Sequence, residues 1–362
     1  MGDNKLLTRK FFFIFLLLLL SFGYGVLVGN YKWFPFEQIR TLKTTFFFHK
    51  KSYKVPEKIN TLSEKLSSSE AIKLRDRLLK AIVPIDEIDV SVKSNANTDI
   101  LETSYYGLNL RGKLDKAHSR SSCLRIYIQG HGGNPDNFNY YNQLHDNFLS
   151  SGCDVLSLSM LGIGLNGGEV SFPTRFGSME LTVDQASHHG NYNFFFDDKN
   201  PNLDALSLFL YPHIRLIDYV VNHDEYENIA IMGISGGGWY TVWLAALMPE
   251  LSLSISYAGS LPLAYRNDKY NHGDWEQVYS PLYKLVSYLQ LYQLMLINEI
   301  GNQTRQAFLI YNDNDACCFM DPAASDLKAR LDNFEFYPQV IIKEEKFHRM
   351  DVPTVLRLLK QD

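Results

Sequence analysis

The sequence predicts an α/β protein, with a mostly parallel eight-stranded sheet covered by helices on both faces and a transmembrane helix in front of it. Three observations predict this architecture. From about residue 86 onward, short β-type runs alternate with helical stretches, which is typical of parallel sheets. At 229–240 (IAIMGISGGGWY) one such run passes directly into a helical stretch through a glycine-rich turn. Near the N-terminus, residues 11–29 (FFFIFLLLLLSFGYGVLVG) carry no charge.

Composition narrows the class of protein. The chain has 362 residues, of which 46% are hydrophobic and 21% are charged, as expected of a globular protein with a large core. Its net charge of −5 argues against a nucleic-acid partner. Its four cysteines are too few for a disulfide scaffold.

The uncharged run predicts a membrane anchor at residues 11–31, behind a short tail at 1–10. It is long enough to span a bilayer as a helix, and longer than the apolar core of about 7–15 residues in a cleaved signal peptide, which is the competing interpretation. Three basic residues precede it, namely Lys5, Arg9 and Lys10. The positive-inside rule therefore places the main domain on the non-cytoplasmic side, although basic residues at 32, 40 and 43 weaken that bias.

Residues 32–85 predict a membrane-proximal stalk and helix in front of the main domain at 86–362. The stretch 31–55 is aromatic and basic, so its rings and lysines are suited to lie at lipid headgroups. Ser63–Ile82 has the pattern of an amphipathic helix, which we expect to pack at the entry of the domain.

The strands and helices of the main domain are predicted from residue type, length and flanking breakers. Strands are expected at Asp89–Lys93, Leu101–Leu114, Leu124–Gln129, Asp154–Met160, Ile229–Met232, Leu251–Tyr257, Ala307–Tyr311 and Val340–Lys343. Helices are expected at Asp136–Ser150, Asp204–Val221, Gly237–Met248, Tyr283–Glu299 and Pro353–Lys360. Two aromatic-rich intervals, at about 162–203 and 260–303, follow strands and predict insertions that shape a substrate pocket.

The glycine-rich turn predicts a nucleophilic serine. Gly233-Ile234-Ser235-Gly236-Gly237 joins a strand to a helix, which is the context of a nucleophile elbow. In such a turn the serine backbone is strained, and the N-terminus of the following helix carries a partial positive charge that suits an oxyanion. Glycine and serine also meet in ordinary turns, but the flanking strand and helix favour catalysis.

A serine nucleophile needs a base to take its proton. Of the ten histidines, His348 follows the last predicted strand, at the edge of the sheet where Ser235 is expected. The pair His188-His189 in the first insertion is the alternative. We expect no metal at that pair, because no further ligands stand at a suitable spacing, and we expect no cofactor.

The base in turn needs an acid to orient it. Asp313 and Asp315 come directly after a predicted strand, with Asp321 next in line. The two acids are also typical of a capped turn. The chain order Ser235, Asp315, His348 is the more informative pattern, because it is the order of the α/β-hydrolase triad.

Together with the turn GHGGN at 130–134 and the strand LRGKLDKA at 110–117, this order makes residues 86–362 resemble the α/β-hydrolases. Within them, the chain is most similar to acetyl-xylan-esterase-like and prolyl-oligopeptidase-like hydrolases. The resemblance implies an oxyanion hole made by backbone N–H groups of Gly133 and Gly236, with His131 and Gly132 in the same turn.

The chain departs from the family at two places. Asn312 stands where relatives usually have the glycine of a Gly-x-x-Asp turn, a register that favours Asp315 and leaves Asp313 open. After the fourth strand, MLGIGLNGG at 160–168 replaces the Asp-x-x-Gly turn of many relatives. The resemblance therefore says little about the substrate.

These residues predict a membrane-anchored serine hydrolase of carboxylesterase type, in which Ser235 is acylated, His348 transfers protons and Asp315 orients His348. Its expected partners are a small-molecule ester and, through the anchor, the lipid bilayer. A peptidase of prolyl-oligopeptidase type is the alternative activity, and a binding module on a hydrolase fold is the alternative class.

The cysteines add one structural expectation. Cys123 and Cys153 each begin a predicted strand, and these two strands are parallel neighbours in the predicted fold. The two cysteines could therefore form a disulfide, or they could remain as two buried thiols. An oxidising compartment would permit the bond. Cys317-Cys318 is the poorer candidate, because a bond between sequence neighbours needs a strained ring.

Overall fold

The computed structural model of the chain describes residues 17, 19–24, 65–84, 87–118, 121–134, 139–196, 205–266, 271–298 and 305–360. Two compact units are present, Met1–Lys54 and Val55–Asp362. The predicted anchor at 11–31 and stalk lie mostly outside the described residues; of the anchor, residues 17 and 19–24 are helical. Within the described part of the chain, no helix is both long and apolar enough to cross a bilayer.

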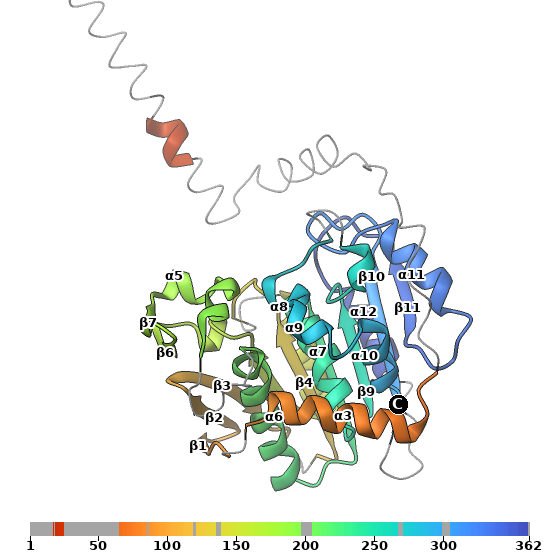
Figure 1. Cartoon of the computed structure of the whole chain (residues 1–362), viewed down its shortest axis with the longest axis horizontal. Helices are drawn as coiled ribbons and strands as arrows, with labels where there is room; N and C mark the ends of the chain where they lie inside the picture. The colour runs from red at the N-terminus through yellow and green to blue at the C-terminus, as the bar shows by residue number, and fades with distance from the viewer. Residues whose placement is uncertain are drawn as a thin grey trace, which may run out of the picture. The chain divides into compact units, whose positions relative to one another are not determined.

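The second unit is built on a nine-stranded sheet with the order β1-β2-β3-β5-β4-β8-β9-β10-β11 (Figure 1). From β5 to β11 all neighbours are parallel, whereas β1, β2 and β3 join the sheet antiparallel. The strands are β1 Val90–Asn95, β2 Thr98–Tyr105, β3 Leu108–Asp115, β4 Cys123–Gln129, β5 Asp154–Ser159, β8 Asn228–Ile234, β9 Leu253–Tyr257, β10 Gln306–Asn312 and β11 Gln339–Lys343. The predicted mostly parallel α/β sheet is confirmed.

The predicted count of eight strands is wrong, because the expected strand Leu101–Leu114 is a hairpin. β2 and β3 pair antiparallel and are joined at Tyr106 and Gly107. Both turn residues have positive φ, 50° and 77°, which is the backbone of a two-residue hairpin turn that follows the twist of the strands. Gly107 adopts this conformation without strain and was the available signal in the sequence.

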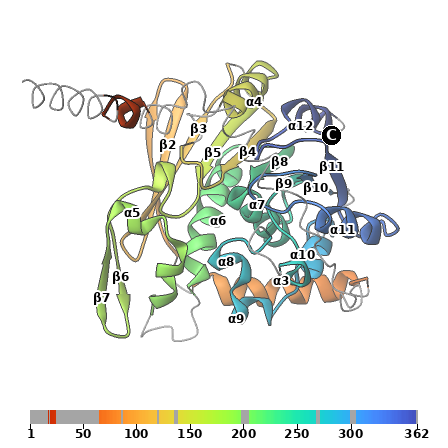
Figure 2. The same cartoon turned by 90° about the horizontal axis from the view of Figure 1, so that it is seen from above.

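Helices cover both faces of the sheet. α6 and α7 lie on one face with α3 and α10 packed over them, and α4 and α12 lie together on the other face (Figure 2). The helices are α3 Ser68–Ile82, α4 Asn139–Ser150, α6 Leu206–His223, α7 Gly236–Leu247, α10 Tyr288–Leu294, α11 Ala323–Leu331 and α12 Val352–Leu359. α11, which flanks β11, was not predicted, and α10 is shorter than the expected Tyr283–Glu299.

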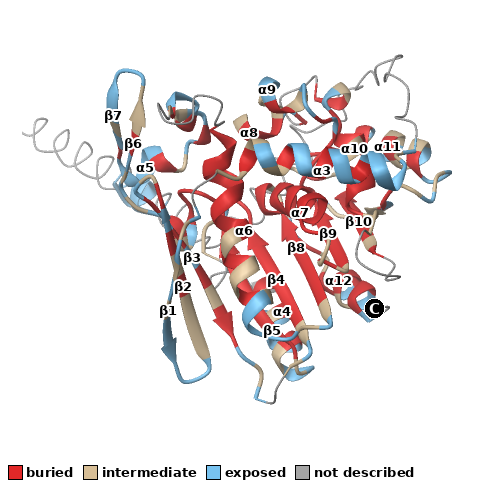
Figure 3. Ribbon diagram, turned by 60° about the horizontal axis from the view of Figure 1, so that its bottom comes forward, coloured by how far each residue is buried: buried red, intermediate tan, exposed pale blue. Residues whose placement is uncertain are grey.

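α7 is the centre of the core. Every residue from Gly236 to Leu247 is buried, as the red ribbon of α7 shows (Figure 3). The sequence GGGWYTVWLAAL is uncharged all round, which is the pattern of a helix enclosed by other elements. Because α7 contacts β4, β8 and β9 on one side and α3, α6 and α10 on the other, its N-terminus is held firmly at the sheet edge.

Two insertions follow strands of the parallel part. The first carries the hairpin β6 (Val170–Thr174) and β7 (Gly177–Leu181), the short helix α5 (Val183–Ala186) and the 3-10 helix η3 (His189–Phe194). The second carries η4 (Leu263–Tyr265), α8 (Trp275–Val278) and α9 (Ser280–Tyr283) before α10. α8 packs against η3, so the two insertions meet.

Cys123 and Cys153 form a disulfide with a Cα–Cα distance of 4.8 Å. The reason is the register of the parallel pair, in which Leu124 lies opposite Asp154 and each cysteine stands one residue earlier. The bond therefore joins the starts of β4 and β5, at the end of the sheet opposite to the end of β8.

Candidate active site

Ser235 lies at the sharp turn between β8 and α7. Its φ of 58° and ψ of −127° fall outside the regions that non-glycine residues ordinarily adopt. Its backbone N–H donates a hydrogen bond of 2.9 Å to the carbonyl of Tyr257 at the end of β9, and its side chain does not cap α7. The turn thus has the strained strand-to-helix backbone of a nucleophile elbow.

The second residue after the serine has no room for a side chain. A Cβ on Gly237 would lie 2.0 Å from the backbone carbonyl oxygen of Ile128, whereas a Cβ on Gly236 would meet the flexible end of Met160, at 2.3 Å from its Cε. The backbone of β4 therefore presses against the first turn of α7. This close approach of two backbone segments is a structural reason for glycine here, in addition to any role in catalysis.

The carboxylate of Asp315 binds the ring of His348. Nδ1 of His348 donates to Oδ2 of Asp315 over 2.8 Å. The other oxygen, Oδ1, accepts the backbone N–H groups of Cys317 at 2.8 Å and of Cys318 at 3.2 Å. Asp315 is fully buried, so these three donors hold a carboxylate that water cannot reach.

His348 lies in the loop between β11 and α12, and its side chain is 19% exposed. Its Nε2, on the side of the ring away from Asp315, has no hydrogen-bond partner among the described residues. No hydrogen bond therefore joins His348 to Ser235 in this structure. Catalytic hydrogen bonds are often long without substrate and shorten when it binds.

The other candidate acids have different partners. Oδ1 of Asp313 accepts the backbone N–H of Glu345 over 3.1 Å and ties the loop after β10 to the loop after β11. Oδ1 of Asp321 accepts the backbone N–H and the hydroxyl of Ser325 at the start of α11. Of the three acids, Asp315 is the one that contacts His348, and its catalytic role stays a prediction.

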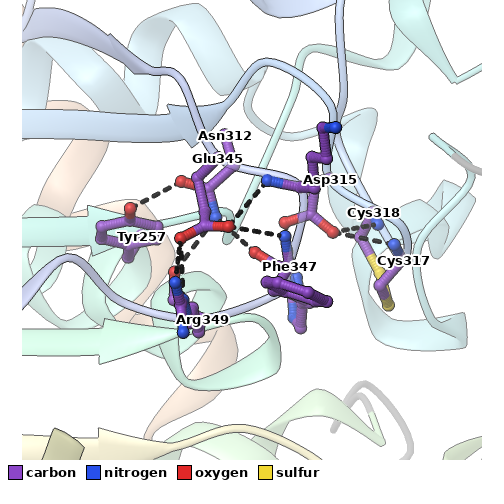
Figure 4. Close-up of polar contacts among 10 residues, drawn as sticks. Tyr257, Asn312, Asp315, Cys317, Cys318, Glu345, Phe347 and Arg349 are labelled. Atoms are coloured by element: carbon purple, nitrogen blue, oxygen red, sulfur yellow. Dashed lines mark hydrogen bonds and ion pairs between the residues drawn. A yellow bond between two sulfur atoms is a disulfide. The ribbon is translucent and has the colours of Figure 1, made fainter. Parts of the chain in front are cut away.

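Asn312, the residue at the family's glycine position, holds the histidine loop (Figure 4). Its Nδ2 donates to the carbonyls of Phe347 at 2.8 Å and Arg349 at 3.0 Å, the two residues that flank His348. Its Oδ1 accepts the hydroxyl of Tyr257 at 2.6 Å. In the sequence Asn312 stands out only as a departure from a family, and no local pattern there signals this role.

The turn after β4 passes beside the elbow. A Cβ on Gly130 would lie 2.8 Å from Cβ of Ser235, and a Cβ on Gly236 would lie 3.1 Å from Nδ1 of His131. The structure therefore brings His131 to the first residue of α7, where the predicted oxyanion hole is.

The two glycines after His131 lie farther along this turn. Gly132 is exposed, and Gly133 has a φ of 108°, in the left-handed region that favours glycine. The carbonyl oxygen of Gly133 lies 2.9 Å from the place where a Cβ on Gly164 would stand, so this part of the turn packs against the start of η2 (Gly164–Asn166). The role of Gly133 as an oxyanion donor stays a prediction.

A buried charged cluster adjoins His131. Nδ1 of His189 lies 3.0 Å from Oε2 of Glu276, with both side chains almost completely buried, and Nδ1 of His131 lies 3.5 Å from Oδ2 of Asp274. Burial opposes the charges, but the attraction between Glu276 and His189 outweighs it, which raises the pKa of His189 and lowers the pKa of Glu276. Burial lowers the pKa of His131.

A pocket of about 890 Å³ opens beside this cluster. Its lining comes from the turn after β4 and from both insertions and includes His131, Gly164, His188, His189, Asp274 and Trp275. Neither Ser235 nor His348 is part of the described lining. The pocket therefore meets the candidate catalytic residues at His131, and the alternative base His188 lies on its wall.

Cys317 and Cys318, the pair ranked second in the sequence, also form a disulfide with each other. Both backbone N–H groups converge on Oδ1 of Asp315, which folds the segment after β10 into a tight turn. That turn places the two side chains on the same side. The pair lies directly beside the acid that contacts His348.

Comparisons with known proteins agree with this geometry at the level of the fold. No protein-family model matches the sequence, and neither does any curated protein. Among solved structures, methylesterase BT1017 matches with a TM-score of 0.54 and 14% identity, over 81% of this chain and 63% of that one. Acetyl xylan esterase 1 from Thermoanaerobacterium sp. JW/SL YS485 matches with a TM-score of 0.50 and 17% identity, over 80% of this chain and 92% of that one.

The chain has the α/β-hydrolase fold. The predicted fold class is thereby confirmed for the described part of the main domain. Identities this low show the fold alone, so the activity of this chain is argued from its own site.

Proposed function

We propose that this chain is a serine hydrolase that cleaves carboxylic esters through Ser235, His348 and Asp315 and is anchored in a membrane by residues 11–31. Two observations carry the proposal together: Ser235 stands in a strained strand-to-helix turn, and a buried carboxylate holds His348 by Nδ1. The other ring nitrogen of His348, Nε2, has no partner among the described residues and is available to take a proton.

In the first half of the reaction, Nε2 of His348 takes the proton of Ser235 Oγ as this oxygen attacks the carbonyl carbon of the ester. The negative charge that develops on the carbonyl oxygen is stabilised by the backbone N–H of Gly236 at the N-terminus of α7, and by the N–H of Gly133. The tetrahedral intermediate then loses the alcohol, which takes the proton from His348 and leaves an acyl group on Ser235.

In the second half, Nε2 of His348 takes a proton from water, and the hydroxide attacks the acyl carbon. The bond to Ser235 Oγ breaks, the proton returns to the serine, and a carboxylic acid leaves. Asp315 keeps Nδ1 protonated throughout and stabilises the imidazolium that forms in each half. The fully buried carboxylate is suited to this role, because its charge is not screened by water.

The test is covalent labelling of the full chain in detergent with a fluorophosphonate, followed by mapping of the adduct. We expect the adduct on Ser235, and we expect Ser235→Ala to lose both labelling and turnover of p-nitrophenyl acetate, by about 10⁶-fold in kcat. Ser187→Ala is the matched control, because Ser187 lines the neighbouring pocket and should label and react as the native chain does. An unlabelled native chain would refute the proposal, and labelled protein that cleaves peptides but no ester would shift it to a peptidase.

The proposed location of the hydrolase domain rests on the predicted anchor and on one disulfide. Residues 11–31 are uncharged and long enough to span a bilayer. The disulfide between Cys123 and Cys153 is typical of an oxidising compartment, which supports a hydrolase domain on the non-cytoplasmic side.

Two measurements test this location. The full chain should sediment with membranes, need detergent for release and keep its N-terminus, whereas a soluble chain beginning near residue 26 would show a cleaved signal peptide. In sealed vesicles with the cytoplasmic face outward, the hydrolase domain should resist added protease until detergent opens them. Digestion without detergent would place the domain on the cytoplasmic side.

A further inference from the structure

Three side chains from different parts of the sequence converge beside the pocket. A ring nitrogen of His131, a ring nitrogen of His189 and a carboxylate oxygen of Glu276 all lie within 4.8 Å of one another. They come from three segments, namely the turn after β4, the start of η3 and α8. The proposed hydrolysis uses none of these side chains for proton transfer, so their convergence needs another explanation.

The orientation of His189 is the first clue. Its Nε2 lies 3.0 Å from the carbonyl oxygen of Leu161 and must donate its proton there. In the neutral ring, Nδ1 is then unprotonated and offers a lone pair. This arrangement is common in metal-binding histidines, whose second ring nitrogen is fixed by a backbone carbonyl.

The contact between His189 and Glu276 is the second clue. Nδ1 and Oε2 are only 3.0 Å apart, yet neither atom makes a hydrogen bond. They are close enough for an ion pair but are not aimed at each other. Two atoms that bind the same ion at about 2.0–2.2 Å also lie close together without a hydrogen bond between them. The reason is that the lone pair of each atom points at the ion and not at the other atom.

The burial of Glu276 is the third clue. The residue is fully buried, and neither carboxylate oxygen has a hydrogen-bond partner. A carboxylate in such a place is costly unless a cation compensates it. The rings of His131 and His189 are 4.7 Å apart, so both histidines would repel each other if protonated, whereas two neutral rings can share one ion.

We propose that His131, His189 and Glu276 bind a divalent metal ion of the zinc type. Two imidazoles and one carboxylate are a ligand set that zinc takes when a fourth position stays open. Both histidines line the pocket, so the fourth position is accessible from there, and the pocket is the entry path for the ion. Asp274, at 3.5 Å from Nδ1 of His131, orients that ring.

A second group of three ligating side chains exists in the described part of the chain, made by Cys317, Cys318 and His348. It does not compete as a metal site, because the two sulfurs are bonded to each other and Nδ1 of His348 is bound to Asp315. It does provide the alternative location that the experiment must exclude.

The experiment measures metal binding and is independent of hydrolysis. The full chain is purified in detergent with a tag that lacks histidine, stripped with a chelator and titrated with Zn²⁺ against a chromogenic competitor. The metal content is counted by mass spectrometry, and Co²⁺ is used to read the coordination from its visible spectrum. The variants are Glu276→Gln and His131→Gln, with His188→Gln as the matched control on the same pocket wall.

We expect about one equivalent of Zn²⁺, a four-coordinate Co²⁺ spectrum, and affinity at least about 100-fold weaker in Glu276→Gln and His131→Gln but unchanged in His188→Gln. The side chain of His131 is 32% exposed, so its variant tests the site even if the buried Glu276 variant does not fold. Absence of stoichiometric binding would overturn the proposal. The close approach of His189 and Glu276 would then be explained by a proton that lies between them. Binding of equal strength in the native chain and both variants would overturn it as well, because the ion would then lie elsewhere.

Discussion

Replacing Asp315 with asparagine tests the proposed mechanism most directly. In the native site Oδ2 of Asp315 accepts the proton of His348 Nδ1, while Oδ1 accepts two backbone N–H groups, from Cys317 and Cys318. In Asp315→Asn these two donors determine the orientation of the amide, because only its oxygen can accept them. The NH₂ group must then face His348 Nδ1.

The consequence is a change of tautomer. An NH₂ group facing Nδ1 donates a hydrogen bond to it, so Nδ1 must be unprotonated and the proton of the neutral ring moves to Nε2. A protonated Nε2 cannot take the proton of Ser235. The expected loss is about 10⁴-fold in kcat, which is about 5.4 kcal/mol in transition-state stabilisation.

The assay is kcat for p-nitrophenyl acetate in the full chain, together with the rate of fluorophosphonate labelling and a far-UV spectrum that checks the fold. Asp313→Asn is the matched control. Its amide oxygen can still accept the N–H of Glu345, so kcat should change by less than about tenfold, or about 1.4 kcal/mol. The reasoning is refuted if Asp313→Asn costs as much as Asp315→Asn, or if folded Asp315→Asn loses less than about tenfold.

Three further predictions concern catalysis and stability. Ser235→Ala and His348→Ala should each remove nearly all esterase activity, and the double variant should lose little more, because the groups act as a unit; additive losses in kcat would contradict this. Cys123 and Cys153 close a loop of 30 residues, so their replacement by alanine should lower the free energy of unfolding by about 3.6 kcal/mol in a urea titration, whereas an unchanged midpoint would show that the bond does not form. Burial opposes the charge of Asp115, but hydrogen bonds outweigh it and hold its pKa at about 2, below that of the unfolded chain. Asp115→Asn should therefore lower the free energy of unfolding at pH 7, with a difference that shrinks as the pH falls from about 4 toward 2; a constant difference would show that the carboxylate charge is not its cause.

The sheet and the order of the candidate residues could be predicted from the sequence because both depend on local patterns. Parallel strands buried on both faces are mostly continuous apolar runs, as in β8, and their carboxyl ends share one edge. Residues directly after such strands therefore meet in space, and this brings Asp315 to His348. The turn at Tyr106 and the helix α11 were missed, because one exposed glycine and nine residues of mixed character are weak local signals.

The buried cluster could not be predicted in this way. His131 lies in a turn, His189 begins a short 3-10 helix and Glu276 lies in a helix of four residues, so none belongs to a pattern with a period. Their meeting depends on how the two insertions fold back on the turn after β4. No further ligand stands near His188-His189 in the sequence, whereas the residues that we propose to share a metal with His189 come from other segments.

Asn312 shows how a departure from a family pattern can be explained by the structure. A glycine at this place would leave the carbonyls of Phe347 and Arg349 without their amide donor and the hydroxyl of Tyr257 without its acceptor. Asn312 is fully buried, so these three bonds form away from water, where an unmade hydrogen bond is costly. Because the two carbonyls stand on either side of His348, the amide fixes the backbone that carries the proposed base. In this chain the end of β10 thus positions both proposed partners of the serine, His348 through Asn312 and Asp315 through its own turn.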